Sequence, residues 1–190
     1  RLAKKACMQV MELVKQNIRP RDIMTPEAFH NAETVDMALG CSTNTMLHLP
    51  AIAHECGIQL NLHHSNEIAA KTPNLCHLAP AGFTYMEDLD RAGGVYAVMK
   101  ELADAGLLHT DVMTCTGKTM AENIAHADNL NPEIIRPMDN PYMATGGIAV
   151  LFGNLAQALP GSPLLIICIL FFVAPIVYNF VAPKHEVAAE

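Results

Sequence analysis

Residues 25–45 read TPEAFHNAETVDMALGCSTNT and carry the start and stop signals of a helix. Thr25 suits the N-cap position and Pro26 the first helical position, and the acidic residue that follows complements the positive end of the helix dipole. The helical pattern then continues to Leu39, and Gly40 is the residue type that most often ends a helix. We therefore predict one helix over Pro26–Leu39.

The small polar turn at residues 40–44 opens a second predicted helix, over residues 43–55. Its backbone N–H groups and the positive end of that helix are suited to a substrate carboxylate. The hydroxyls of Ser42 and Thr43 and the side chain of Asn44 can add hydrogen bonds, so these three are the candidate substrate-binding residues. The alternative interpretation is an ordinary helix cap, which needs no ligand.

Working outward from this stretch, helical patterns alternate with short apolar runs. Residues 2–17 place apolar side chains at helical spacing, and Pro20 ends that pattern. Further helices are predicted over residues 65–71, 86–92, 95–105 and 118–127. Short strands are predicted over residues 74–78, 111–116 and 148–152. This alternation predicts an α/β fold that is rich in helix.

Composition excludes several classes of function. The 190 residues carry a formal net charge of −7, aromatic residues make up 5%, and Trp is absent. A nucleic-acid partner is not expected, because the chain has neither a basic stripe for phosphates nor a stacking platform for bases. The six cysteines form no CxxC pair, so no zinc site and no redox dithiol is predicted. Free, buried thiols in a reducing cytoplasm are expected instead.

Other tempting motifs lack the spacing that their chemistry needs. The histidines form no HxxxH pair with a carboxylate base. Residues 117–119 read GKT like the end of a phosphate-binding loop, but Val112 stands where that loop needs its first glycine. The sequence therefore predicts neither a metal site nor a nucleotide site.

The C-terminal end differs in kind from the rest. No charged residue occurs from Asn140 to Pro183, and residues 164–182 are nearly all apolar. A helix of that length just crosses a bilayer core of about 30 Å. We predict an apolar helix there and consider it a candidate transmembrane helix, with a buried helix as the alternative.

Several sequence blocks, in one order and spacing, resemble dihydroxy-acid dehydratases of the dihydroxy-acid and phosphogluconate dehydratase family. They are IRPRDIMT at 18–25, VDMALGCSTNT at 35–45, LHLPAIA at 47–53, KTPNLCHLAPAG at 71–82, MEDL at 86–89, TGKT at 116–119 and TGGIAVL at 145–151. The resemblance implies that residues 1–156 are part of the family's N-terminal domain. Residues 157–190 are then an unrelated apolar tail.

The resemblance also implies a chemistry. Members of the family are hydro-lyases that convert 2,3-dihydroxy acids to 2-keto acids in branched-chain amino-acid biosynthesis, and the parent enzyme is expected to be a homodimer. They use an iron–sulfur cluster held by three cysteines, a magnesium ion held by carboxylates and a modified lysine, and a serine base. The resemblance places the cluster and magnesium motifs upstream of Arg1 and the serine beyond Ala156. No catalytic residue and no metal ligand is thus expected here, and we predict that this chain alone is inactive.

Two further expectations and two alternatives complete the interpretation. Cys41 and Cys76 match outside the cluster motifs and are expected to be buried thiols. The first alternative is a piece of a sugar-acid dehydratase acting on phosphogluconate or an aldonate. The sequence of residues 71–82, however, is more similar to the enzymes of the amino-acid pathway. The second is a non-catalytic remnant held in a membrane by residues 164–182 rather than a cytoplasmic protein.

Overall fold

Helix α3, Pro26–Leu39, is the central element of the structure and has the predicted boundaries. In the computed structural model, which describes residues 2–152, the Thr25 hydroxyl accepts a hydrogen bond from Ala28 N at 3.2 Å. Gly40 ends the helix in the left-handed region, with φ 63° and ψ 52°. Nine of the fourteen residues of α3 are buried, so neighbouring elements cover most of its surface.

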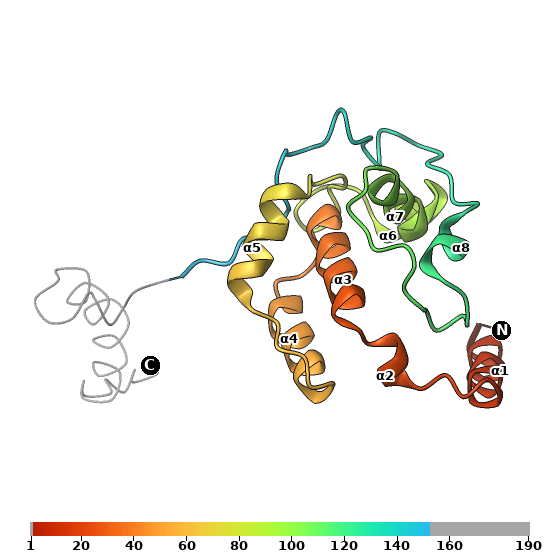
Figure 1. The fold of residues 1–190 in the computed structure, drawn as a ribbon. Coiled ribbons are helices and arrows are strands. Elements are labelled where there is room, and N and C mark those ends of the chain that lie inside the picture. Colours follow the sequence, from red (N-terminus) through yellow and green to blue (C-terminus); the bar gives the residue numbers. More distant parts are fainter. Residues whose placement is uncertain (1, 153–190) are drawn as a thin grey trace, which may run out of the picture. The chain divides into compact units, whose positions relative to one another are not determined.

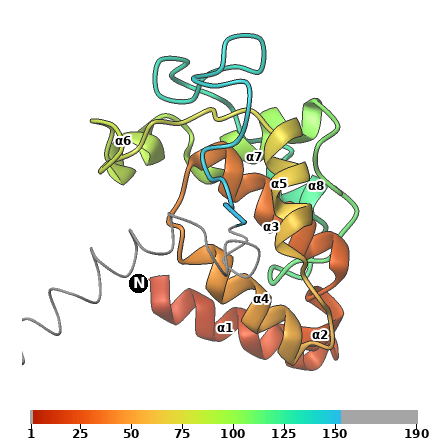
Figure 2. The ribbon, with the colours of Figure 1, turned by 90° about the vertical axis from the view of Figure 1, so that its left-hand side faces the viewer.

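Seven further helices are described, and most of them pack on or near α3. They are α1 Leu2–Lys15, α2 Pro20–Ile23, α4 Thr45–Glu55, α5 Leu62–Lys71, α6 Met86–Arg91, α7 Gly94–Asp104 and α8 Met120–Ile124. Helices α4, α5 and α7 contact α3 directly, and α7 also contacts α6 and α8. Figures 1 and 2 show α3 at the centre, with α5 and α7 beside it.

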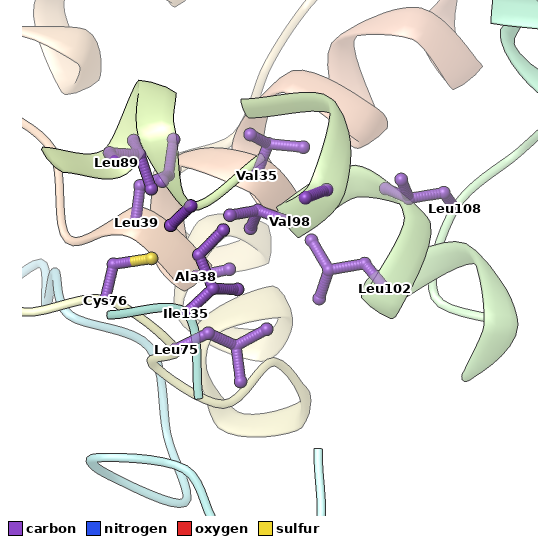
Figure 3. Packing of buried hydrophobic residues seen from close by; sticks show 12 residues of the cluster. Val35, Ala38, Leu39, Leu75, Cys76, Leu89, Val98, Leu102, Leu108 and Ile135 are labelled. Carbon is purple, nitrogen blue, oxygen red and sulfur yellow. The ribbon is translucent and has the colours of Figure 1, made fainter. Parts of the chain in front are cut away.

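The main hydrophobic core lies between α3 and α7. Leu39 from α3, together with Val98 and Leu102 from α7, meets side chains from two irregular segments, Leu75 and Ile135 (Figure 3). Leu75, Leu102 and Ile135 are fully buried. Truncating such a leucine to alanine typically costs about 2–5 kcal/mol, so these contacts supply much of the stability of the fold.

The helix-rich part of the predicted fold is confirmed, whereas the strands of an α/β fold are absent from the described residues. Residues 2–152 contain no strand, and pairing is limited to three isolated bridges at Asn74–Met143, Leu78–Thr84 and Met113–Thr119. Residues 74–76 are buried as expected, but Leu75 N donates to Ala38 O of α3 and Leu75 O accepts from Arg136 N, both at 2.8 Å. Helix and loop partners thus satisfy the backbone that a ladder would otherwise pair.

The other two predicted strands are also absent. Residues 111–116 form turns closed by Thr114 N bonding Lys118 O at 3.0 Å, and residues 148–152 have no regular structure. The fold of the described residues is therefore helical.

Several helix boundaries differ from the prediction for local reasons. Helix α5 begins three residues early, because Asn61 Oδ1 accepts from His63 N at 2.9 Å and caps it. Helix α8 is shorter than expected, because Thr119 caps it and exchanges hydrogen bonds with Glu122. Helix α4 begins at Thr45 rather than at residue 43, because the preceding residues form a turn.

The expected thiol burial is only partly confirmed. The cysteines of the described residues are free, yet Cys7, Cys41 and Cys115 are exposed and only Cys76 is fully buried. Among residues 2–152, no helix is both long and apolar enough to span a bilayer. The predicted apolar helix at residues 164–182 lies outside the described residues.

Candidate functional site

The turn at residues 40–44 is held by the end of α3. The N–H groups of Gly40 and Cys41 both donate to Asp36 O, at 3.0 and 3.3 Å, which turns the chain sharply. A Cβ on Gly147 would lie 2.6 Å from Gly40 Cα, so the two glycine backbones are in close contact. A larger residue at position 147 would push the turn away from that segment, whereas a Cβ on Gly40 would lie 3.1 Å from Asn74 Nδ2.

The three predicted binding residues lie together in this turn, and all three are exposed. Ser42 Oγ accepts from Asn44 N at 3.3 Å, and Ser42 O accepts from Thr45 N at 3.0 Å. Asn44 has helical dihedral angles and makes no side-chain cap bond, so the ordinary cap interpretation does not describe this turn. Among the described residues, nothing accepts a hydrogen bond from the N–H of Ser42 or Thr43.

Beneath the turn lies Asp36, a residue that the sequence analysis did not single out. It is only 4% exposed. The Thr45 hydroxyl lies 2.7 Å from Asp36 Oδ2 and 2.7 Å from Ser42 O, but it has a single proton to donate. Protonation of Asp36 satisfies both contacts, because the carboxyl then donates to Thr45 and Thr45 donates to Ser42.

Burial and hydrogen bonding shift the pKa of Asp36 in opposite directions. Burial raises the pKa of Asp36, an effect that hydrogen bonding by Thr45 and by the Cys41 thiol partly offsets. The pKa of Cys41 is itself raised to about 12, by loss of water around the sulfur first and by Asp36 second, although the residue as a whole is exposed. The base of the turn is therefore a hydrogen-bonded group of side chains in which Asp36 interacts with Thr45 and Cys41.

A cavity of about 230 Å³ lies on the other side of Gly40. Its walls come from four separate segments of the chain: Gly40, Asn74, Cys76, His77, Leu78, Ala81, Tyr142, Met143 and Gly147. The polar residues of its wall could not be recognised from the sequence, because no motif links residues near 40, 75 and 142.

Side-chain contacts fix that polar wall. Asn74 Nδ2 donates to Ala38 O at 3.1 Å, which ties the wall to α3. The Tyr142 ring lies 5.4 Å from the His77 ring and 5.0 Å from the guanidinium carbon of Arg136. The Tyr142 hydroxyl donates to Glu133 O at 2.9 Å. The cavity thus has an aromatic ring and an imidazole at one side.

The described residues do not fit an iron–sulfur cluster. A cluster needs several cysteine thiolates close together. Within residues 2–152, no three His, Cys, Asp or Glu side chains come together in a way that could hold a metal ion.

Comparison with known proteins identifies the family to which this chain is related. Residues 1–123 match the family model described as dihydroxy-acid/6-phosphogluconate dehydratase N-terminal. Over 156 residues, 82% of this chain, it is 70% identical to a dihydroxy-acid dehydratase of Lachnoclostridium phytofermentans and 68% identical to one of Clostridium beijerinckii. In each case the aligned part is 28% of the relative's length. The chain belongs to the dihydroxy-acid/6-phosphogluconate dehydratase family and spans part of its N-terminal domain.

Proposed function

We propose that this chain supplies part of the N-terminal domain of a dihydroxy-acid dehydratase, and that the turn at residues 40–44 binds the substrate carboxylate. The observation that carries the proposal is the pair of free N–H groups at Ser42 and Thr43, beside two exposed hydroxyls and the Asn44 amide. Backbone N–H groups at a helix start are a common anion site.

The geometry at the base of the turn supports this role. The Thr45 hydroxyl lies 2.7 Å from both Asp36 Oδ2 and Ser42 O, and so ties the turn to α3. The adjoining cavity of about 230 Å³ offers space for the rest of a small dihydroxy acid, with His77 and Tyr142 available to its hydroxyls. We thus propose that this chain binds and orients the substrate. The catalytic residues belong to the rest of the parent enzyme.

The reaction proposed for the parent is the loss of water from a 2,3-dihydroxy acid to give a 2-keto acid. In the family, an iron–sulfur cluster and magnesium would supply positive charge to the departing hydroxide and the enolate. Since the described residues lack a fitting ligand set, the proposal assigns both groups to other parts of a homodimeric parent. The relatives' names favour a dihydroxy acid over 6-phosphogluconate as the substrate.

The proposal divides the chain at residue 156. Residues 1–156 are the dehydratase part, residues 157–190 are an unrelated tail, and the protein works in the cytoplasm. The free cysteines support a reducing compartment.

A domain exchange tests the proposed function. In the L. phytofermentans dehydratase, the 156 aligned residues are replaced by those of this chain, and keto-acid formation from 2,3-dihydroxyisovalerate is measured. We expect an active chimera, and we expect no turnover from the 190-residue chain alone, even with iron, sulfide and magnesium supplied. Turnover of gluconate in preference to dihydroxyisovalerate would assign the chain to the sugar-acid branch.

Substitutions in the chimera test the binding turn. Ser42→Ala together with Thr43→Pro, which removes an N–H donor and both hydroxyls, should raise KM at least tenfold. Thr114→Ala removes a hydroxyl from a turn remote from this site, and should leave KM unchanged. A folded chimera whose KM is unaltered by the double substitution contradicts the assignment of the turn.

A further inference from the structure

Helix α1 leaves apolar side chains exposed, unlike an ordinary amphipathic helix, which turns its apolar face toward the core. None of its residues is buried, although it is one of the two longest helices described. At 3.6 residues per turn, Ala6, Val10 and Val14 follow one another along one face, with Cys7 and Met11 beside them. Val10, Met11 and Val14 are 56%, 53% and 66% exposed. These five residues are called the outer face of α1.

The half-buried residues of α1 are Gln9, Glu12 and Leu13, two polar residues and one apolar residue. Gln9 and Gln16 lie against the turn at Gly117, where an added Cβ would be 3.9 Å from Gln9 Nε2 and 3.4 Å from Gln16 Oε1. Figure 1 shows α1 at the edge of the described helices, below the segment that precedes α8. A helix normally turns its apolar stripe toward the core and its polar stripe toward water.

The outer face is uncharged and composed of aliphatic side chains and sulfur, which matches an apolar protein surface. It lies inside residues 1–123, the part that matches the dehydratase N-terminal domain, so α1 is part of that domain rather than an addition to it. The aligned relatives place only 28% of their length in this region, which leaves most of a dehydratase chain outside it. The uncharged apolar face and the length of the relatives outside the aligned region both favour this remaining polypeptide as the partner.

We propose that the outer face of α1 is the docking surface for another segment of a dehydratase polypeptide, one that lies outside the 156 aligned residues. The inference rests on the proposed function, because it takes the chain to be part of a larger dehydratase. It goes beyond that function in naming the surface through which this part and the remainder are joined.

Cys7 provides a direct probe, because it lies on the outer face and is exposed. Its reaction with N-ethylmaleimide, followed by mass spectrometry of the peptides, is compared between the full 190-residue chain and the chimera described above. We expect labelling of Cys7 to be at least tenfold slower in the chimera. Equal labelling rates in the two proteins overturn the proposal.

Matched substitutions on α1 give a second measurement. Val10→Asp should leave the thermal midpoint of the isolated chain unchanged and lower that of the chimera. Met8→Asp, at a position that is 57% exposed and off the outer face, should be neutral in both. If the chimera does not fold, the L. phytofermentans enzyme itself carries the test, with cysteine placed at the position aligned with Val10.

The alternatives give distinct results. Protection of Cys7 in the isolated chain that grows with protein concentration would identify a second copy as the occupant, and protection by phosphatidylserine vesicles would identify a membrane; either result overturns the proposal. A folded but inactive chimera with protected Cys7 refutes the proposed function and leaves the docking surface standing. An active chimera in which Cys7 stays reactive supports the proposed function and refutes the docking surface.

Discussion

Two glycines that flank α7 have positive φ for different reasons. A Cβ on Gly93, at φ 120°, would lie 2.2 Å from Asp128 O and 2.7 Å from Ala97 Cβ, whereas one on Gly106, at φ 74°, meets nothing within 4 Å. Gly106→Ala should therefore cost only backbone strain, about 1 kcal/mol. Gly93→Ala adds a clash with the backbone and should cost more than about 3 kcal/mol. Urea unfolding measures both, and equal costs would contradict the close approach of residue 128.

His30 makes the fold sensitive to acid. Its Nδ1 is buried and has no hydrogen-bond partner among the described residues, and its ring lies 5.0 Å from that of His109 and 6.2 Å from that of His64. Burial lowers the pKa of His30 below 6.5, and His109, His64 and Lys71 lower it further. Three acidic groups lie near this cluster: Glu67 pairs with His64, Glu33 also interacts with His64, and Glu27 interacts with His109.

The sign of the pH dependence follows from that depressed pKa. In the unfolded chain His30 takes up a proton near pH 6.5, whereas the folded chain resists it, so the unfolded state binds more protons below that pH. Stability should therefore fall as pH decreases from about 7 through 6 and below. His30→Gln should flatten this fall, as measured by urea unfolding at several pH values. His48→Gln, at an exposed position, serves as the control, and an identical pH slope in wild type and His30→Gln would refute the assignment.

The candidate site shows what residue patterns can and cannot predict. The binding turn was predictable, because its glycine, hydroxyls and amide are adjacent in the sequence. Asp36 stood within the same stretch, but its burial depends on how α4 folds back over α3. Asn74 and Tyr142 could not be found from sequence, because their approach to Gly40 depends on long-range packing that no local motif encodes.

Among the elements, α3 depends on a local capping signal. Removing the Thr25 hydroxyl leaves Ala28 N without its acceptor, and loss of an N-cap typically costs about 1 kcal/mol. Thr25→Ala should lower the free energy of unfolding by that amount, because α3 is the helix around which the others pack. Thr43→Ala is the matched control and should change stability by less than about 0.5 kcal/mol, since Thr43 is exposed. Equal losses from the two substitutions would show that the cap does not hold α3.

Helix boundaries were predictable where the signal was local. The Thr-Pro start and Gly stop of α3 gave both ends correctly, and the glycine pair at residues 93–94 separated α6 from α7. Strands failed because a strand needs a partner, and apolar runs such as residues 74–76 pack equally well in an irregular segment buried under a helix. Periodicity alone does not distinguish the two.

At the scale of the whole molecule, burial is distributed unevenly along the chain. Helices α3 and α7 line the main core, and their side chains include fully buried positions such as Met37, Val98 and Leu102. Helix α1 contributes no buried residue, and only its Gln9, Glu12 and Leu13 are half-buried. Because local opening is opposed mainly by buried contacts, the two regions should differ widely in opening free energy.

Hydrogen–deuterium exchange of the 190-residue chain measures this difference directly. Amides of α1 should exchange within seconds to minutes at neutral pH, as in a helix with little tertiary support, whereas those of α3 and α7 should exchange only by global unfolding. Leu102→Ala, which removes a buried core side chain, should speed exchange in α3 and α7 and leave α1 unchanged. In the chimera with the L. phytofermentans dehydratase, α1 should gain protection comparable to α3, because its outer face is then covered. Slow exchange of the α1 amides in the isolated chain, at concentrations where the chain is monomeric, would contradict this prediction. It would show that contacts other than those of the exposed apolar face stabilise the helix.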